Sequence, residues 1–164
     1  MNRVVAHGVE VVYDRAGSGD PIVLAHGGAV DARSWIFQEP LTDEFDLIVW
    51  DEPGNGRSED LAPGWGLTDS AEALAGLIQE LEVQPAHVGG LSWGGVVALE
   101  LYRRHPELVG TLILAGSYAG WKGSLPGEEV AARVSGFEQS LAHPEERGQP
   151  FPGLFKVDPL PHEI

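Results

Sequence analysis

A single serine lies among closely spaced glycines in the segment GGLSWGG, residues 89–95. Ser92 is the centre of a G-x-S-x-G pattern that Gly90 and Gly94 complete. A strand-like apolar run precedes the pattern and a helix-forming run follows it, which is the context this motif needs when its serine is a nucleophile. A sharp strand-to-helix turn would lift the hydroxyl out of the sheet, in a backbone conformation that costs about 1–3 kcal/mol.

Two backbone amides are candidates for stabilising an oxyanion beside that hydroxyl. The turn points the first amides of the following helix at the space next to the serine, where negative charge is favoured. Trp93 supplies the first amide, and Gly28, in the sequence His26-Gly27-Gly28, can present the second without a side chain in the way. Small residues here could also serve only close packing of strand and helix, but we interpret Ser92 as the nucleophile. We interpret His26 as an orienting residue rather than a base.

The elements that must position these residues follow from the apolar pattern. Residues 4–17 alternate apolar and polar around His7-Gly8 and predict two short antiparallel strands. Continuous apolar runs predict strands covered on both faces, and an apolar stripe at helical spacing predicts a helix over 68–82, with Asp69 and Glu72 as its N-terminal cap. Strands are predicted at 22–25, 47–50, 86–90 and 111–116, and further helices at 94–104 and 127–142.

This alternation of buried strands and helices predicts an α/β fold with a mostly parallel sheet and helices on both faces. Ligands bind at the carboxyl ends of the strands in such sheets. His26-Gly27-Gly28, the loop 51–58 and Ser92 all follow predicted strands and should therefore meet at one edge. We divide the chain into a core at 1–116 and a lid or cap segment at 117–164.

Composition limits the classes of function. The 164 residues hold 10 Lys and Arg against 25 Asp and Glu, a net charge of −15 that argues against nucleic acid and anionic membranes as partners. There is no cysteine, so disulfides and thiolate chemistry are excluded. No secretory signal or membrane-spanning run is present, so we expect a cytoplasmic protein. No clustering of His and carboxylates indicates a metal, and we expect no cofactor.

The chain resembles the α/β-hydrolase family in three motifs taken together. They are LAHGGAVDARSW at 24–35, WDEPGNGRS at 50–58 and GGLSWGG at 89–95, in the family's order over roughly the first 120 residues. The resemblance implies an eight-stranded sheet and a Ser-acid-His triad, with Ser92 as nucleophile and Gly28 and Trp93 as oxyanion donors. It also implies that Asp51 organises its loop, and it implies esters, lactones or similar acyl compounds as substrates.

The triad acid and histidine have no clear counterpart in this sequence. In the family they follow strands beyond the lid, whereas six strands are predicted here and the pattern stops after the sixth. His143 and His162 lie in solvated-looking segments, and Glu128, Glu129 and Asp158 are weak candidates for the acid. We therefore expect a sheet truncated after strand six, with little or no activity in the chain alone.

Three interpretations remain open. The chain is a hydrolase fragment, a catalytically inactive binding protein with this fold, or a protein that needs a partner chain to supply the missing strands. Perhydrolase or haloperoxidase chemistry would use the same triad, so the sequence does not separate it from hydrolysis. The expected partner is a small acyl substrate, and the uncovered strand at 111–115 also predicts self-association through an exposed sheet edge.

Overall fold

The first two strands form a hairpin at one side of the sheet. The computed structural model describes residues 1–28, 30–61 and 63–142. β1 (Asn2–Ala6) and β2 (Val9–Gly17) pair antiparallel. His7 and Gly8 make the turn between them, and both have positive φ. The predicted hairpin around these two residues is confirmed.

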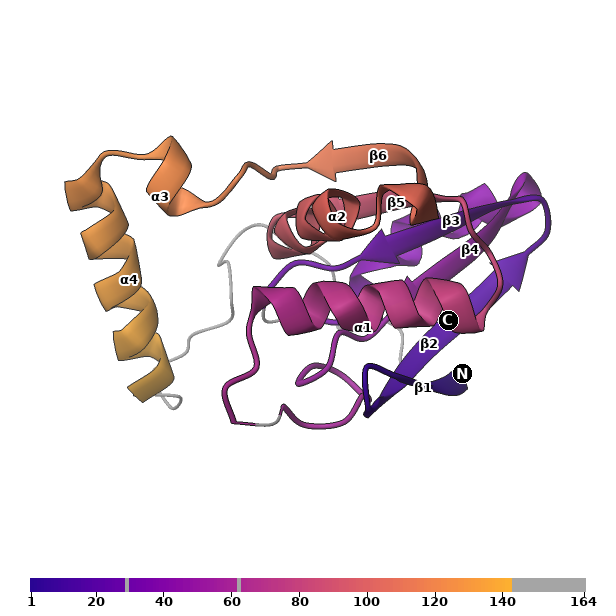
Figure 1. Cartoon of the computed structure of the whole chain (residues 1–164), viewed down its shortest axis with the longest axis horizontal. Helices are drawn as coiled ribbons and strands as arrows, with labels where there is room; N and C mark the ends of the chain where they lie inside the picture. The colour runs from indigo at the N-terminus through magenta and orange to yellow at the C-terminus, as the bar shows by residue number, and fades with distance from the viewer. Residues whose placement is uncertain (29, 62, 143–164) are drawn as a thin grey trace. The chain divides into compact units, whose positions relative to one another are not determined.

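The sheet has six strands in the order β1-β2-β4-β3-β5-β6 (Figure 1). β3 (Asp20–Ala25), β4 (Phe45–Trp50), β5 (Ala86–Leu91) and β6 (Val109–Ala115) are parallel to one another, whereas β2 is antiparallel to β4. Each predicted apolar run falls in one of these strands. The sheet is mostly parallel, as predicted, and the loops that follow β3, β4 and β5 share its carboxyl-terminal edge.

Two hydrophobic clusters lie on opposite faces of the sheet, because successive side chains of a strand alternate between faces. In β4, Ile48 and Trp50 belong to the larger cluster, and Leu47 and Val49 belong to the smaller one. All four are buried. A strand that fills two cores in this way must be apolar at every position, which explains the continuous apolar runs in the sequence.

Helices cover both faces. α1 (Leu67–Glu80) and α2 (Trp93–Arg104) pack on the larger cluster, and both were predicted to within about two residues. The smaller cluster is covered by η1 (Ala32–Asp43), a 3-10 helix that the sequence did not predict. Its apolar residues follow no helical period, so no amphipathic stripe marked it.

The cap of α1 differs from the prediction. Gly66 is the N-cap residue, and Asp69 lies inside the first turn, where its Oδ2 accepts the Gly66 N–H at 2.9 Å. Glu72 takes no part in the cap and instead accepts a hydrogen bond from Arg104 Nε at 2.6 Å. The assignment of Asp69 and Glu72 as the cap pair was therefore wrong, because the first turn starts before Asp69 rather than at it.

β6 forms one edge of the six-stranded sheet and pairs with β5 along its length. Its side chains are mostly exposed, unlike those of β3, β4 and β5. Ile113 is 45% and Leu114 42% exposed although both are large and apolar. The predicted uncovered strand is therefore present as an apolar edge.

A second unit begins at Ala119, after the first unit, Met1–Tyr118. It contains α3 (Trp121–Ser124) and α4 (Gly127–Ala142), and α4 has the predicted bounds. In α4, Glu129 forms an ion pair with Arg133 at 2.8 Å. Function as a lid remains a prediction for this segment, and His143, Asp158 and His162 lie outside the described residues. Among the helices of the described ranges, none has the length and apolarity needed to cross a bilayer.

Candidate active site

Ser92 lies at the tip of a sharp turn between β5 and α2. Its φ is 52° and its ψ −113°, and its side chain is exposed. This left-handed φ is strained for a residue with a side chain, at a cost of about 1–3 kcal/mol. Two hydrogen bonds to residues at the end of β6 hold the turn in place. Ser92 N donates to Ala115 O at 2.9 Å, and Ser117 Oγ donates to Ser92 O at 3.0 Å.

The glycines of the motif are required by close backbone contacts. A Cβ on Gly90 would overlap the backbone of Gly94 and Gly95, and a Cβ on Gly94 would overlap the carbonyl oxygens of Ala25 and His26. These contacts join the first turn of α2 to the end of β3. Side chains at positions 90 and 94 would therefore clash with the backbone of these segments.

Gly28 lies beside Trp93, as the turn geometry required. A Cβ built on Gly28 would be 3.7 Å from the Trp93 Cβ, and one built on Gly27 would be 3.8 Å from the Ser92 Cβ. The loop after β3 therefore runs directly against the start of α2. The structure brings together the three predicted site residues, Ser92, Trp93 and Gly28, while their chemical roles remain a prediction.

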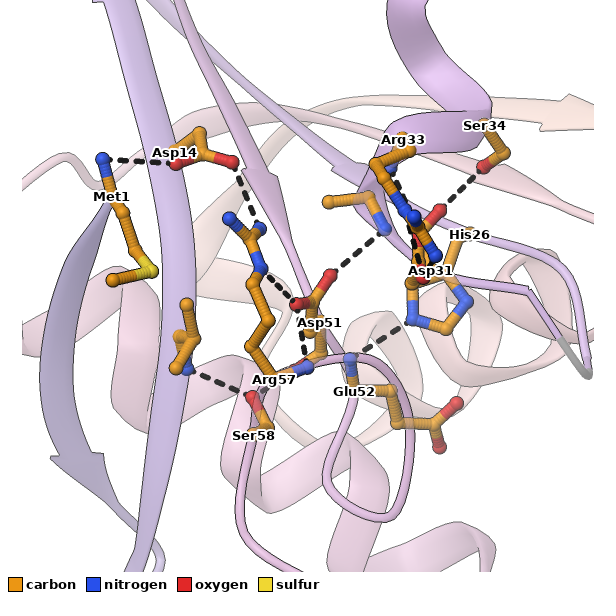
Figure 2. Close-up of polar contacts among 12 residues, drawn as sticks. Met1, Asp14, His26, Asp31, Arg33, Ser34, Asp51, Glu52, Arg57 and Ser58 are labelled. Carbon is orange, nitrogen blue, oxygen red and sulfur yellow. Dashed lines mark hydrogen bonds and ion pairs between the residues drawn. The ribbon is translucent and has the colours of Figure 1, made fainter. Parts of the chain in front are cut away.

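His26 is buried and both of its ring nitrogens have backbone partners. Nδ1 lies 2.8 Å from Gly27 O, and Nε2 accepts the Glu52 N–H at 2.9 Å (Figure 2). Nδ1 therefore carries the proton, and Nε2 has no free lone pair with which to accept another. This bonding supports our interpretation of His26 as an orienting residue.

Asp51 organises the loop that follows β4, as the resemblance implied. Its side chain is buried, Oδ1 accepts the Ala32 N–H at 2.8 Å, and Oδ2 accepts both the backbone N–H and the Nε–H of Arg57, at 2.9 and 2.7 Å (Figure 2). Arg57 also donates to Asp14 at 2.8 Å. Partial burial acts to raise the pKa of Asp14. The contacts with Arg57 and with the N-terminal ammonium outweigh burial, so the pKa is lowered.

The sequence did not single out Glu52, the neighbour of Asp51. Glu52 is 5% exposed, and its carboxylate accepts a hydrogen bond from the Trp93 indole, with Nε1 3.0 and 2.7 Å from the two oxygens. Burial raises the pKa of Glu52 above the usual 4.5, while the nearby Ser70 hydroxyl and the Trp93 indole act in the opposite direction. An acidic residue directly after a buried strand was a visible signal, but no spacing rule predicted that it would face Trp93.

The histidines of the described residues contact groups other than Ser92. His7 lies 3.2 Å from Asp69, and His105 lies 3.1 Å from Glu72. The His87 ring packs edge-on against Phe45, and His26 is bonded as described above. Within residues 1–28, 30–61 and 63–142, no group of His and acidic residues could hold a metal ion.

The family and the relatives are consistent with this geometry. A profile described as alpha/beta hydrolase fold matches residues 20–139. The chain is 31% identical over 128 residues to a dihydrolipoyllysine-residue acetyltransferase component of an acetoin cleaving system from Pseudomonas putida, covering 77% of this chain and 34% of that protein. The chain thus spans about a third of the length of this curated relative.

Solved structures with the same fold include an esterase and a lactone-degrading enzyme. A thermophilic esterase from Thermogutta terrifontis superposes with a TM-score of 0.75 at 31% identity, over 85% of this chain and 53% of that one. An N-acyl homoserine lactone degrading enzyme superposes with a TM-score of 0.73 at 30% identity, over 89% of this chain and 61% of that one.

Proposed function

The chain belongs to the alpha/beta hydrolase fold family, and from this premise we propose that Ser92 is the nucleophile of an acyl hydrolase. The amides of Trp93 and Gly28 are its oxyanion donors. The observation that carries the proposal is the φ of 52° at Ser92, between a central parallel strand and α2. Backbone strain of this kind is concentrated at functional sites, because it persists only where the surrounding structure holds it.

In the proposed reaction, the Ser92 hydroxyl oxygen adds to the carbonyl carbon of the substrate. The carbonyl π electrons move to oxygen, and the resulting oxyanion accepts hydrogen bonds from the two amides. The bond to the leaving alcohol then breaks, and water hydrolyses the acyl-enzyme. The serine proton must pass to a base within hydrogen-bond reach. Because the described histidines contact other groups, we expect the chain by itself to react slowly.

The proposed substrates are esters, lactones or related acyl compounds. Two solved relatives support this class, since one is named as an esterase and the other as an enzyme that degrades an N-acyl lactone. Attack on either substrate forms the same tetrahedral oxyanion, so one pair of amides serves both.

The proposal is tested by labelling the 164-residue chain with a fluorophosphonate probe and by hydrolysis of p-nitrophenyl acetate. We expect slow labelling and slow turnover, both removed by Ser92→Ala. Ser18→Ala is the matched control, because Ser18 is an exposed serine in the turn between β2 and β3 and should leave both rates unchanged. Equal labelling of the S92A and unchanged chains would contradict the assignment, and fast turnover would show that a base within the chain has been overlooked.

A further inference from the structure

Glu52 is bonded to both segments that carry the proposed oxyanion donors. Through its carboxylate it accepts the indole N–H of Trp93, with Nε1 2.7 Å from Oε2. Through its backbone N–H it donates to His26 Nε2 at 2.9 Å, and His26 Nδ1 in turn lies 2.8 Å from Gly27 O. One residue therefore links the start of α2 to the loop that presents Gly28.

The Glu52 carboxylate has an uncharged hydrogen-bond donor, the Trp93 indole, rather than a cation. The Ser70 hydroxyl of α1, a residue that is 2% exposed, is also near and opposes the rise in the pKa of Glu52. Ser70 Oγ accepts the indole N–H of Trp65 at 3.1 Å. A buried carboxylate bonded in this way fixes the orientation of its donors, because moving them would leave the charge unsatisfied in a dry environment.

We propose that Glu52 is a positioning residue that holds Trp93 and the Gly28 loop in register, so that their two amides converge on one oxyanion. The inference rests on the proposed function of Ser92. Glu52 acts through Trp93 and His26 and need not touch the substrate. Aligned donors matter because a displacement of about 1 Å at a reacting centre can cost on the order of a hundredfold in rate.

The surroundings of Glu52 also predict that its influence on the Trp93 indole changes with pH. The groups that face Glu52 are the Trp93 indole from α2, the Ser70 hydroxyl from α1 and the His26 ring, which accepts its backbone N–H. Burial raises the pKa of Glu52, so the carboxyl keeps its proton to higher pH than an exposed glutamate. Titration of Glu52 should therefore be visible at the Trp93 indole it contacts.

The first test is the rate of fluorophosphonate labelling of Ser92 in the 164-residue chain, at one pH and with folding verified by circular dichroism. Glu52→Gln keeps an acceptor oxygen for the Trp93 indole and should keep the rate within about twofold, whereas Glu52→Ala should lower it about tenfold. Asp46→Asn is the matched control, since Asp46 is also buried but pairs with Arg15. It should leave the labelling rate unchanged.

The second test is independent of activity and uses the indole ¹H–¹⁵N resonance of Trp93, assigned from its loss in Trp93→Phe. In the unchanged chain this resonance should shift with pH, with a midpoint above 4.5, and in Glu52→Gln it should not. In Glu52→Ala the amide resonances of Gly28 and Trp93 should both move. Where Glu52→Ala does not fold, the loss of indole titration in Glu52→Gln decides the test.

Each outcome decides the proposal. An E52A labelling rate within twofold of the unchanged chain, an E52Q rate as slow as that of E52A, or a Trp93 indole that does not titrate would overturn it. If Ser92 labels no faster than the S92A background, the proposed function fails instead. The resonances of Trp93 and Gly28 then decide by themselves whether Glu52 holds the two segments together.

Discussion

The centre of the sheet and its β6 edge place the same kinds of residue under opposite constraints. At the centre, Gly94 lies against backbone oxygens at the end of β3, and Asp51 and Glu52 are buried with hydrogen-bond donors. At the edge, a Cβ on Gly110 would make only ordinary van der Waals contacts, and Ile113 is 45% exposed. Both regions adjoin strands of the parallel part of the sheet, so the difference shows that cover by neighbouring elements decides what a position tolerates.

The same substitution at two glycines should give the largest contrast. A Cβ at Gly94 would overlap Ala25 O and His26 O, so Gly94→Ala should lower the free energy of unfolding by at least about 3 kcal/mol. A Cβ at Gly110 would meet nothing nearer than 3.6 Å, so Gly110→Ala should be neutral or stabilising by about 0.5 kcal/mol. Urea denaturation followed by circular dichroism measures both, and equal losses would refute the contrast.

Removing the Asp51 carboxylate should have the next largest effect. Asp51→Ala leaves the amides of Ala32 and Arg57 without their acceptor and the Arg57 side chain without its buried partner. We expect a loss of about 3 kcal/mol in the free energy of unfolding, measured as above. Asp20→Ala, at an exposed strand end, is the control and should change it by less than about 0.5 kcal/mol.

Glu52 should give a smaller, pH-dependent effect. Its pKa is raised in the folded chain, so the folded state keeps a proton that the unfolded state releases above about 4.5. The free energy of unfolding should therefore fall as pH rises through the folded pKa, on the order of 1 kcal/mol per unit of pKa difference. Glu52→Gln cannot titrate, so its stability relative to the unchanged chain should rise over the same interval.

Glu72 supplies the control with the opposite sign. Arg104 lowers its pKa, so the stability that it contributes is present above the unfolded pKa and is lost as pH falls. Glu72→Gln should therefore be less stable than the unchanged chain at pH 7 and equal to it at low pH. Chemical denaturation across pH 3–8 compares the variants, and parallel profiles for E52Q and E72Q would refute the assignment at Glu52.

A substitution in the β6 edge strand should have the smallest effect on stability but a clear effect on self-association. We expect the chain to self-associate with rising concentration, because an apolar edge strand offers unpaired backbone groups to a second copy. Ile113→Lys should abolish association in sedimentation velocity while changing the free energy of unfolding by less than about 0.5 kcal/mol. A monomer at all concentrations in the unchanged chain would contradict this expectation.

Much of the fold could be predicted because the strands of the sheet centre contain continuous apolar runs. The runs in β3 and β4 place side chains in both hydrophobic clusters, and the glycines around Ser92 fixed the turn. η1 could not be predicted, because the apolar residues that it places in the smaller cluster do not recur at a helical spacing. Gly66 was missed as a cap because it has no side chain to reveal that role.

The main-chain geometry of the site could be predicted better than the side-chain contacts that support it. The proximity of Ser92, Trp93 and Gly28 could be predicted because it depends on main-chain geometry, which glycine spacing indicates. The contact of Glu52 with Trp93 was missed because it depends on which way one side chain turns after β4, and the sequence distance to Trp93 carries no such information. Ser117 was missed for the same reason, since its hydroxyl reaches Ser92 O from the end of β6.

The parallel pairing of β3 with β5 has a consequence for the order of folding. It joins Ile22 to His87, with η1, β4 and α1 lying between them in the chain. Closing so long a loop is entropically unfavourable, so this contact should form late, after the β1–β2 hairpin and α1, whose contacts are local. The strained turn at Ser92 depends on both β3 and β5. A chain emerging from the ribosome should therefore complete the turn at Ser92 only after most of the core has already condensed.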